Sequence, residues 1–289
     1  MKQLLLLSGK GGTGKTTVAS AFIDLLKAKA YADCDVDAPN LHLIHNHFPS
    51  EQDTDYFSFP KAKIDEKICI DCGKCMAACR FDAIHRKERY TVDSLTCEGC
   101  KTCTLVCPVS AISMQEAKAG ELHLFADAQS VFSTATLKMG SGTTGKLVTK
   151  VKEQLKKNAP KTDIAIIDGS PGIGCPVIAS LAGVDLVLIV AEPSVSGVSD
   201  MLRIIQTASQ FQVKVVVCIN KYDTNVQQSA LIEAFCWKKE IPFMGKIPFD
   251  KEAIKAINQG KTIVEVDCDS GLAVRSVFDN TMHLLKRST

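Results

Sequence analysis

The sequence lacks the long apolar run that a membrane-spanning helix needs. No apolar stretch in its 289 residues approaches the roughly 20 residues that cross a bilayer. An excess of one charge is missing too, because 34 Lys and Arg are balanced by 32 Asp and Glu. This balance argues against a dedicated nucleic-acid binder. We therefore expect no membrane span and no nucleic-acid partner.

We expect no secretory leader either. The first residues, MKQLLLLSGKGG, hold one Lys and four Leu and run directly into a Gly-rich loop. This apolar segment is too short for a signal peptide, so we expect a cytoplasmic protein. Disulfides are disfavoured in that compartment, and clustered cysteines there indicate metal binding or catalysis.

Cysteine is abundant, and its spacing repeats. Of 13 cysteines, eight lie between Cys69 and Cys107, and the other five are scattered and read as small buried residues. CIDCGKCMAACRFDAI and CEGCKTCTLVCPVSAI both have the spacing C-x2-C-x2-C-x3-C. This is the bacterial ferredoxin run, in which the fourth Cys ligates the other cluster. Two 4Fe–4S clusters are predicted, one on Cys69, Cys72, Cys75 and Cys107, the other on Cys97, Cys100, Cys103 and Cys79.

Zinc is the rival interpretation of these cysteines. Zinc ribbons use C-x2-C pairs separated by longer gaps, which does not fit a third and fourth Cys so close. One departure from the ferredoxin pattern is Arg80, which stands where the second copy has Pro108. We expect residues 59–118 to form a small ferredoxin-like α+β domain that needs its metal to fold.

A phosphate-binding loop precedes this domain. LLLLSGKGGTGKTTVASAFIDLLKAK reads as an apolar strand, a G-x4-G-K-T loop and an amphipathic helix. Backbone N–H groups of such a loop face phosphates, Lys15 is expected to reach the β- and γ-phosphates, and Thr16 is expected to ligate Mg²⁺. The predicted nucleotide-binding residues are Gly9, Lys10, Gly11, Gly12, Thr13, Gly14, Lys15, Thr16 and Thr17.

The loop GKGGTGKT resembles the deviant Walker A motif of the MinD/ParA superfamily of P-loop ATPases. That resemblance implies that Lys10 reaches across a dimer to the partner's nucleotide. YADCDVDAPNLHL resembles the segment that positions the attacking water, which makes Asp35 the expected hydrolytic residue and Asp33 the runner-up. DIAIIDGSPGIG resembles Walker B and its switch, so Asp168 is expected to act through Mg²⁺.

Alternating strands and helices after residue 119 predict the fold class. We expect an α/β, mostly parallel sheet of MinD-like P-loop type, formed by residues 1–58 and 119–289 with residues 59–118 inserted. Asn220 follows a later strand, and the resemblance implies that it contacts adenine. NKYD also matches the guanine-reading motif of GTPases, so ATP is favoured and GTP stays open.

Three further features have competing interpretations. GSGTTGKL, residues 140–147, matches part of a second P-loop, but we expect it to begin a helix. His42, His45 and His47 are expected to be ordinary partly exposed imidazoles. Cys175 lies just beyond the switch, where a cluster shared between subunits is an alternative to simple packing.

Two classes of function remain open on the sequence. In the first, ATP binding and hydrolysis control electron transfer to, or metallocluster assembly on, a client protein. In the second, a MinD/ParA-like positioning or regulatory switch carries clusters that sense redox state or brace the fold. Both imply ATP, Mg²⁺ and two 4Fe–4S clusters, and a homodimer or a heterodimer with a paralogous ATPase.

Overall fold

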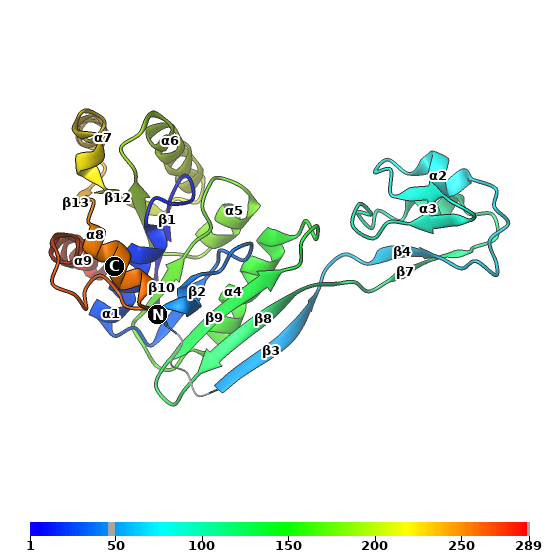
Figure 1. Cartoon of the computed structure of the whole chain (residues 1–289), viewed down its shortest axis with the longest axis horizontal. Helices are drawn as coiled ribbons and strands as arrows, with labels where there is room; N and C mark the ends of the chain where they lie inside the picture. Colours follow the sequence, from blue (N-terminus) through cyan, green and yellow to red (C-terminus); the bar gives the residue numbers. More distant parts are fainter. Residues whose placement is uncertain (46–49, 288–289) are drawn as a thin grey trace. The chain divides into compact units, whose positions relative to one another are not determined.

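The chain forms two compact units in the computed structural model, which describes residues 1–45 and 50–287. The larger unit takes in the described parts of 1–53, 122–136 and 144–289, and the smaller one 54–121 with 137–143 (Figure 1). Within the smaller unit, the N–H of Lys138 in the segment 137–143 bonds to the carbonyl of Ala119 at 2.8 Å.

The larger fold is built on a nine-stranded sheet of order β13-β12-β11-β1-β10-β2-β9-β8-β3. The first five strands in the chain that belong to it are β1 (Lys2–Leu7), β2 (Ala30–Asp33), β3 (Ser50–Phe57), β8 (Lys118–Ala126) and β9 (Val131–Leu137). The other four are β10 (Ile164–Asp168), β11 (Leu186–Ala191), β12 (Lys214–Asn220) and β13 (Phe243–Ile247).

Parallel pairing joins β13, β12, β11, β1, β10, β2 and β9 in turn. In a parallel sheet the carboxyl ends of the strands share one edge, which is where such folds bind ligands. The loops after β1, β2, β10 and β12 therefore meet at that edge. The predicted α/β fold class is confirmed, and the sheet also extends beyond β9 through β8 and β3.

Both faces of the sheet centre are buried, as the continuous apolar strands require. Leu4 and Leu6 of β1 join a core cluster with Phe22 and Val277. Leu5 and Leu7 point to the opposite face, because side chains alternate along a strand, and they are also fully buried.

Helices cover these faces. The helices of the larger fold are α1 (Lys15–Leu26), α4 (Thr144–Asn158), α5 (Cys175–Leu181), α6 (Val195–Gln210), α7 (Val226–Lys238), α8 (Lys251–Asn258) and α9 (Asp269–Arg287), with 3₁₀ turns at Leu41–Leu43 and Tyr222–Thr224.

The smaller unit has its own core. The strands β4 (Lys61–Ile64) and β7 (Ile112–Gln115) form one antiparallel pair, and β5 (Ile84–Arg86) and β6 (Tyr90–Val92) form another. The short helices α2 (Lys74–Ala78) and α3 (Thr102–Val106) accompany them. Buried Cys75, Cys97 and Cys103 lie in this core among Ile84 and Tyr90.

Several local expectations can be compared with these elements. The expected helix after Gly142 is confirmed by α4. His42 is partly exposed, whereas His45 is buried and its Nε2 lies 2.9 Å from Ser20 Oγ, which corrects the expectation of partial exposure at that position. His47 lies outside the described residues. Among the helices of residues 1–45 and 50–287, none has the length and apolar character to cross a membrane.

Candidate functional site

Gly-rich backbone places the phosphate-binding loop at the start of α1. Gly12 and Gly14 adopt φ values of 78° and 89°, a region that favours glycine. A Cβ on Gly14 would stand 2.2 Å from Nδ2 of Asn220, so both the backbone angle and the space require glycine there. The loop thus ends at a helix N-terminus, where backbone N–H groups and the helix dipole favour anions.

Asp168 joins Walker A to Walker B directly. Its Oδ1 lies 2.5 Å from Lys15 Nζ, and its Oδ2 accepts a hydrogen bond from Thr16 Oγ1 at 2.7 Å. Lys15 is 5% exposed and Asp168 is fully buried, so the charge pair is largely removed from water. In P-loop proteins an ammonium at this place contacts the phosphates, and a hydroxyl and a carboxylate hold the magnesium ion.

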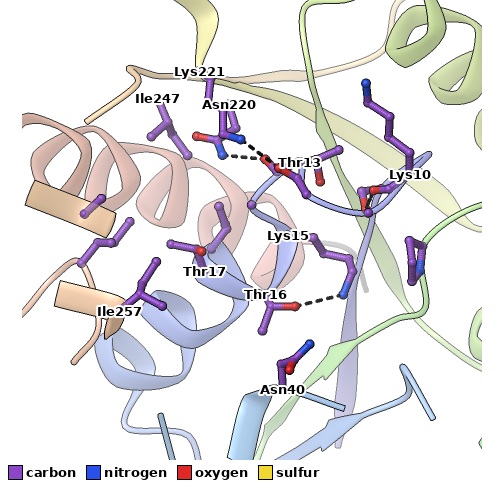
Figure 2. A pocket seen from close by; sticks show the side chains of 18 of the residues that line it. Lys10, Thr13, Lys15, Thr16, Thr17, Asn40, Asn220, Lys221, Ile247 and Ile257 are labelled. Carbon is purple, nitrogen blue, oxygen red and sulfur yellow. Dashed lines mark hydrogen bonds between the residues drawn. The ribbon is translucent and has the colours of Figure 1, made fainter. Parts of the chain in front are cut away.

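Lys15 and Thr16 line a cavity of about 700 Å³ at the carboxyl edge of the sheet (Figure 2). One end is polar and contains the loop from Lys10 to Thr17 together with Asp35 and Asn40. The other end is apolar and includes Ile247, Pro248, Phe249, Ile254 and Ile257. A cavity with a phosphate-binding end and an apolar end suits a nucleotide, whose base is the less polar part.

Asp35 and Asp33 differ in what surrounds their carboxylates. Burial raises the pKa of Asp35 to about 6, and its side chain lines the cavity. Burial and the nearby Asp168 raise the pKa of Asp33 to about 7. The Asp33 oxygens accept hydrogen bonds from the backbone N–H groups of Asp35, Asn40 and Leu41 at 2.9–3.0 Å. Asp33 therefore shapes the loop, and Asp35 is the carboxylate of the two that can face a bound water.

Lys10 is held on its own chain, away from Lys15. Its Nζ lies 2.5 Å from Glu192 Oε2, 3.3 Å from Ser194 Oγ and 3.4 Å from Ser196 Oγ. These partners follow β11 and begin α6, and sequence reasoning did not identify them. Lys10 keeps 38% of its side chain exposed, so it lies at the rim of the cavity and can reach outward.

Asn220 and its neighbours close the cavity at the end of β12. Asn220 Nδ2 donates to the carbonyl of Thr13 at 2.7 Å, and Lys221 Nζ donates to that of Gly12 at 2.8 Å. Asp223 Oδ1 accepts from the N–H of Phe249 at 2.8 Å. The NKYD segment therefore secures the P-loop and the apolar wall, and sequence reasoning had considered only its contact with a base.

The switch segment after β10 contacts the P-loop strand. The N–H of Gly172, whose φ is 92°, bonds to the carbonyl of Ser8 at 2.9 Å. Ser170 Oγ donates to the carbonyl of Cys34 at 2.5 Å, so this serine is both buried and hydrogen-bonded. Cys175 begins α5 and is exposed.

The eight clustered cysteines line two separate hollows in the smaller unit. Cys79, Cys97, Cys100 and Cys103 line one, with Ala62, Val92 and Met114 among its walls. Cys69, Cys72, Cys75 and Cys107 line the other, with Ile64, Tyr90 and Ile112. Each hollow thus gathers three cysteines from one repeat and the fourth from the other repeat. Four thiol groups in an apolar hollow fit a 4Fe–4S cluster.

The backbone conformation is the same at matched positions of the two cysteine repeats. Left-handed φ values occur at matched positions, 53° at Asp71 and 69° at Gly99, then 48° at Asp82 and 52° at Ser110. The N–H of Ala83 bonds to Cys79 Sγ at 3.4 Å and that of Ala111 bonds to Cys107 Sγ at 3.3 Å. N–H donors to sulfur tune cluster potentials.

Arg80 leaves this turn unchanged. Cys79, before it, has φ −77° and ψ 114°, and Cys107, before Pro108, has φ −77° and ψ 111°. The departure from the ferredoxin pattern therefore does not alter the path of the chain.

Comparison with known proteins agrees with this geometry. The model of the CobQ/CobB/MinD/ParA nucleotide binding domain matches residues 4–263. The chain belongs to this family. A Methanocaldococcus jannaschii relative, MJ0578, is 34% identical over 237 residues, which cover 77% of this chain and 79% of the relative.

Two further matches describe the two parts of this family member. A ferredoxin of Pyrobaculum islandicum is 43% identical over 58 residues, 19% of this chain and 53% of the ferredoxin. The solved structure of the septum site-determining protein MinD with Mg-ADP from Pyrococcus horikoshii aligns with a TM-score of 0.60 at 16% identity, covering 100% of this chain and 98% of that one. The first agrees with an inserted ferredoxin-like domain, and the second shows the fold.

Proposed function

We propose that the protein is a Mg²⁺-dependent ATPase carrying two 4Fe–4S clusters, whose nucleotide state controls electron transfer to, or metallocluster assembly on, a partner protein. The observation that carries the proposal is the presence in one chain of a P-loop cavity and of two four-cysteine hollows. An ATPase that only positions a cargo has no need of two redox groups.

In the proposed reaction, Lys15 and the loop N–H groups bind the β- and γ-phosphates, and Thr16 and Asp168 hold Mg²⁺. This assignment is supported by their convergence, with Asp168 2.5 Å from Lys15 and 2.7 Å from Thr16. Asp35 orients the attacking water. Its raised pKa, about 6, lies close to a neutral operating pH, as a general base requires.

The base is proposed to be adenine. A guanine-reading Asp must present its carboxylate to the base edge, but Asp223 is not among the described residues that line the cavity, and its Oδ1 accepts from the N–H of Phe249. Asn220 likewise donates one amide hydrogen to the carbonyl of Thr13. The apolar residues from Ile247 to Phe249 offer a surface for a purine ring. They do not offer a set of hydrogen-bond acceptors that would recognise the N–H groups of guanine. Asp223→Asn should therefore leave any preference for ATP over GTP in place.

The two cysteine sets are proposed to hold the clusters, which supply one-electron transfer when bound. The chain's own contribution is an apolar wall that limits water and the N–H bonds to Cys79 and Cys107. Dimerisation, with a second copy or with a paralogous ATPase, and a cytoplasmic location belong to the same proposal.

The alternative is a positioning or regulatory switch with sensing or structural clusters. It is favoured by the likeness of the fold to MinD, and a fold alone supports many functions. The two classes differ in what ATP changes, which makes them separable by experiment.

The test uses protein purified without oxygen. Iron and sulfide are quantified, the clusters are reduced, and reduction or metallation of a co-purifying partner is followed with ATP, with ADP and without nucleotide. Transfer that requires ATP and is lost in Lys15→Ala supports the proposal. ATP-dependent assembly on DNA or membranes, with transfer indifferent to nucleotide, supports the alternative. Zinc in place of iron would remove the redox role altogether.

A further inference from the structure

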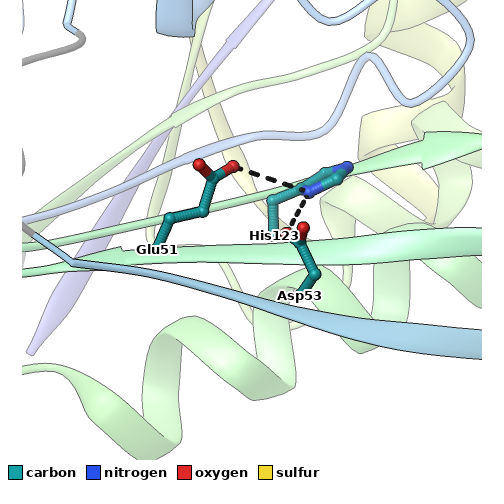
Figure 3. Close-up of side chains that lie close together, drawn as sticks. All are labelled: Glu51, Asp53 and His123. Carbon is teal, nitrogen blue, oxygen red and sulfur yellow. Dashed lines mark hydrogen bonds and ion pairs between the residues drawn. The ribbon is translucent and has the colours of Figure 1, made fainter.

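A histidine and two carboxylates face one another on adjacent strands, outside the nucleotide cavity and the cysteine hollows. Glu51 and Asp53 lie on β3, and His123 lies on β8 (Figure 3). His123 Nδ1 is 2.6 Å from Asp53 Oδ1 and 4.0 Å from Glu51 Oε1. One ligand atom from each residue lies within 4.8 Å of the other two. All three side chains belong to the larger unit.

A contact with the second ring nitrogen, Nε2, orients the imidazole of His123. His123 Nε2 lies 3.3 Å from the hydroxyl of Thr136 on β9. A threonine hydroxyl can donate or accept, so it satisfies Nε2 whichever ring nitrogen carries the proton. The 2.6 Å contact with Asp53 places a proton on Nδ1, and a bound cation would take the place of that proton while Nε2–H donates to Thr136. A hydrogen bond to the distant ring nitrogen is the usual support of a metal-binding histidine.

The negative charges of Glu51 and Asp53 are not balanced by the positive side chains that contact them. Asp55, two residues further along the same face of β3, pairs with Lys118 at 2.6 Å. Within residues 1–45 and 50–287, no Lys or Arg pairs with Glu51 or Asp53, and their ion-pair contacts are those with His123. Two carboxylates share one imidazole, which is at most singly charged. A divalent cation would neutralise them where Lys118 neutralises Asp55.

We propose that Glu51, Asp53 and His123 bind a first-row divalent transition ion of the Zn²⁺ class, which ties the edge strand β3 to β8. Bonds of about 2.0–2.1 Å at tetrahedral angles place ligand atoms about 3.4 Å apart, between the separations seen here. An imidazole ligand favours such ions over Mg²⁺ and Ca²⁺. Three protein ligands leave a fourth position for water, so the ion is exchangeable.

The test titrates Zn²⁺ into the full-length, cluster-loaded chain without oxygen or nucleotide, with Mg²⁺ in large excess to occupy sites that prefer it. His123→Gln and Asp53→Asn are compared with two matched controls, His283→Gln at an exposed position of α9 and Asp55→Asn on β3. Cluster absorbance and the melting temperature of each variant establish that it is folded. Hydrogen exchange of the β3 and β8 amides is followed with and without Zn²⁺.

One Zn²⁺ should bind to the wild-type chain and to both controls. His123→Gln and Asp53→Asn should weaken that binding at least tenfold, since each removes a ligand atom. Zn²⁺ should slow exchange in β3 of the wild type and leave it unchanged in His123→Gln. Equal zinc affinity in wild type and His123→Gln, or no protection of β3 by Zn²⁺, overturns the proposal. Neither outcome depends on ATP hydrolysis or on electron transfer.

Discussion

Lys10 Nζ lies 2.5 Å from Glu192 Oε2, at the rim of the nucleotide cavity. The lysine that the family resemblance assigns to a partner's nucleotide is therefore engaged by a carboxylate of its own chain. To act across an interface, Lys10 must leave Glu192 and the two serines beside it. The Lys10–Glu192 contact in the unpaired chain therefore opposes dimerisation through Lys10, and its effect on the dimer dissociation constant can be measured.

Removing Lys10 tests its part in dimerisation. Lys10→Ala should abolish ATP-induced dimerisation and lower the ATPase rate by roughly 10²–10³-fold, because one preorganised charge in a water-excluded site is worth that much. Sedimentation with a slowly hydrolysed ATP analogue and a steady-state assay measure the two effects. A variant that dimerises normally and hydrolyses ATP at the full rate would falsify the assignment of this loop.

Removing Glu192 should have the opposite and smaller effect. Both partners are partly exposed, at 38% and 22%, and such ion pairs contribute about 0–1 kcal/mol. Glu192→Gln should therefore tighten the ATP-dependent dimer by no more than about fivefold for each Lys10 released, with little change in melting temperature. The dimer dissociation constant provides the measurement. Weaker pairing in Glu192→Gln would mean that this carboxylate belongs to the interface itself.

Acid should inhibit hydrolysis through Asp35. Burial raises its pKa to about 6, so the carboxylate is protonated as pH falls through that value. The rate of hydrolysis should decline by up to about tenfold per pH unit below pH 6, since only the ionised form accepts a proton. Rates between pH 5 and 8 with saturating Mg-ATP give the profile.

The control for this profile is Asp35→Asn. It should be slower by roughly 10²–10⁴-fold and nearly independent of pH in the same range. If Asp35→Asn keeps the wild-type pH profile, the group that titrates is Asp33, whose pKa is about 7.

The stability effect of Asp35 has a definite sign. Its folded pKa exceeds the ordinary value of 3.8, so the fold binds its proton more tightly than the unfolded chain does. This contribution to the free energy of unfolding is fully present below about pH 4 and is lost as pH rises through about 6. Nucleotide-free protein should show this slope in denaturant titrations, and Asp35→Asn should reduce it, leaving the part that Asp33 contributes.

Each repeat supplies the fourth cysteine of the other repeat's cluster site, and this crossed arrangement can be tested directly. Cys107 shares a hollow with Cys69, Cys72 and Cys75 rather than with its sequence neighbours. Cys107→Ser should therefore damage the cluster bound by the first repeat, and Cys79→Ser the cluster bound by the second. Electron paramagnetic resonance of reduced, anaerobic protein distinguishes the two, and loss of the same signal in both variants would contradict the crossed arrangement.

Local sequence determined much of this protein. The Gly-x4-Gly-Lys-Thr loop between an apolar strand and a helix is a local structure, because glycine at positions 12 and 14 permits left-handed backbone angles that few other residues adopt. The cysteine repeat is equally local, and its matched spacing produces matched turns at Asp71 and Gly99. Continuous apolar runs predicted the buried parallel strands from β10 to β12.

Tertiary structure alone decided which distant groups meet. Nothing in the residues near Lys10 indicates Glu192, and nothing near Asp223 indicates the N–H of Phe249. The sequence favoured Asp35 over Asp33 through the family resemblance alone, and the physical difference between them, backbone donors around Asp33 and the cavity beside Asp35, comes from the tertiary structure. The pairing of β3 with β8, which brings Asp53 to His123, joins residues 70 positions apart. Such contacts depend on strand order and register, and these are set by burial summed over the whole sheet rather than by any short motif.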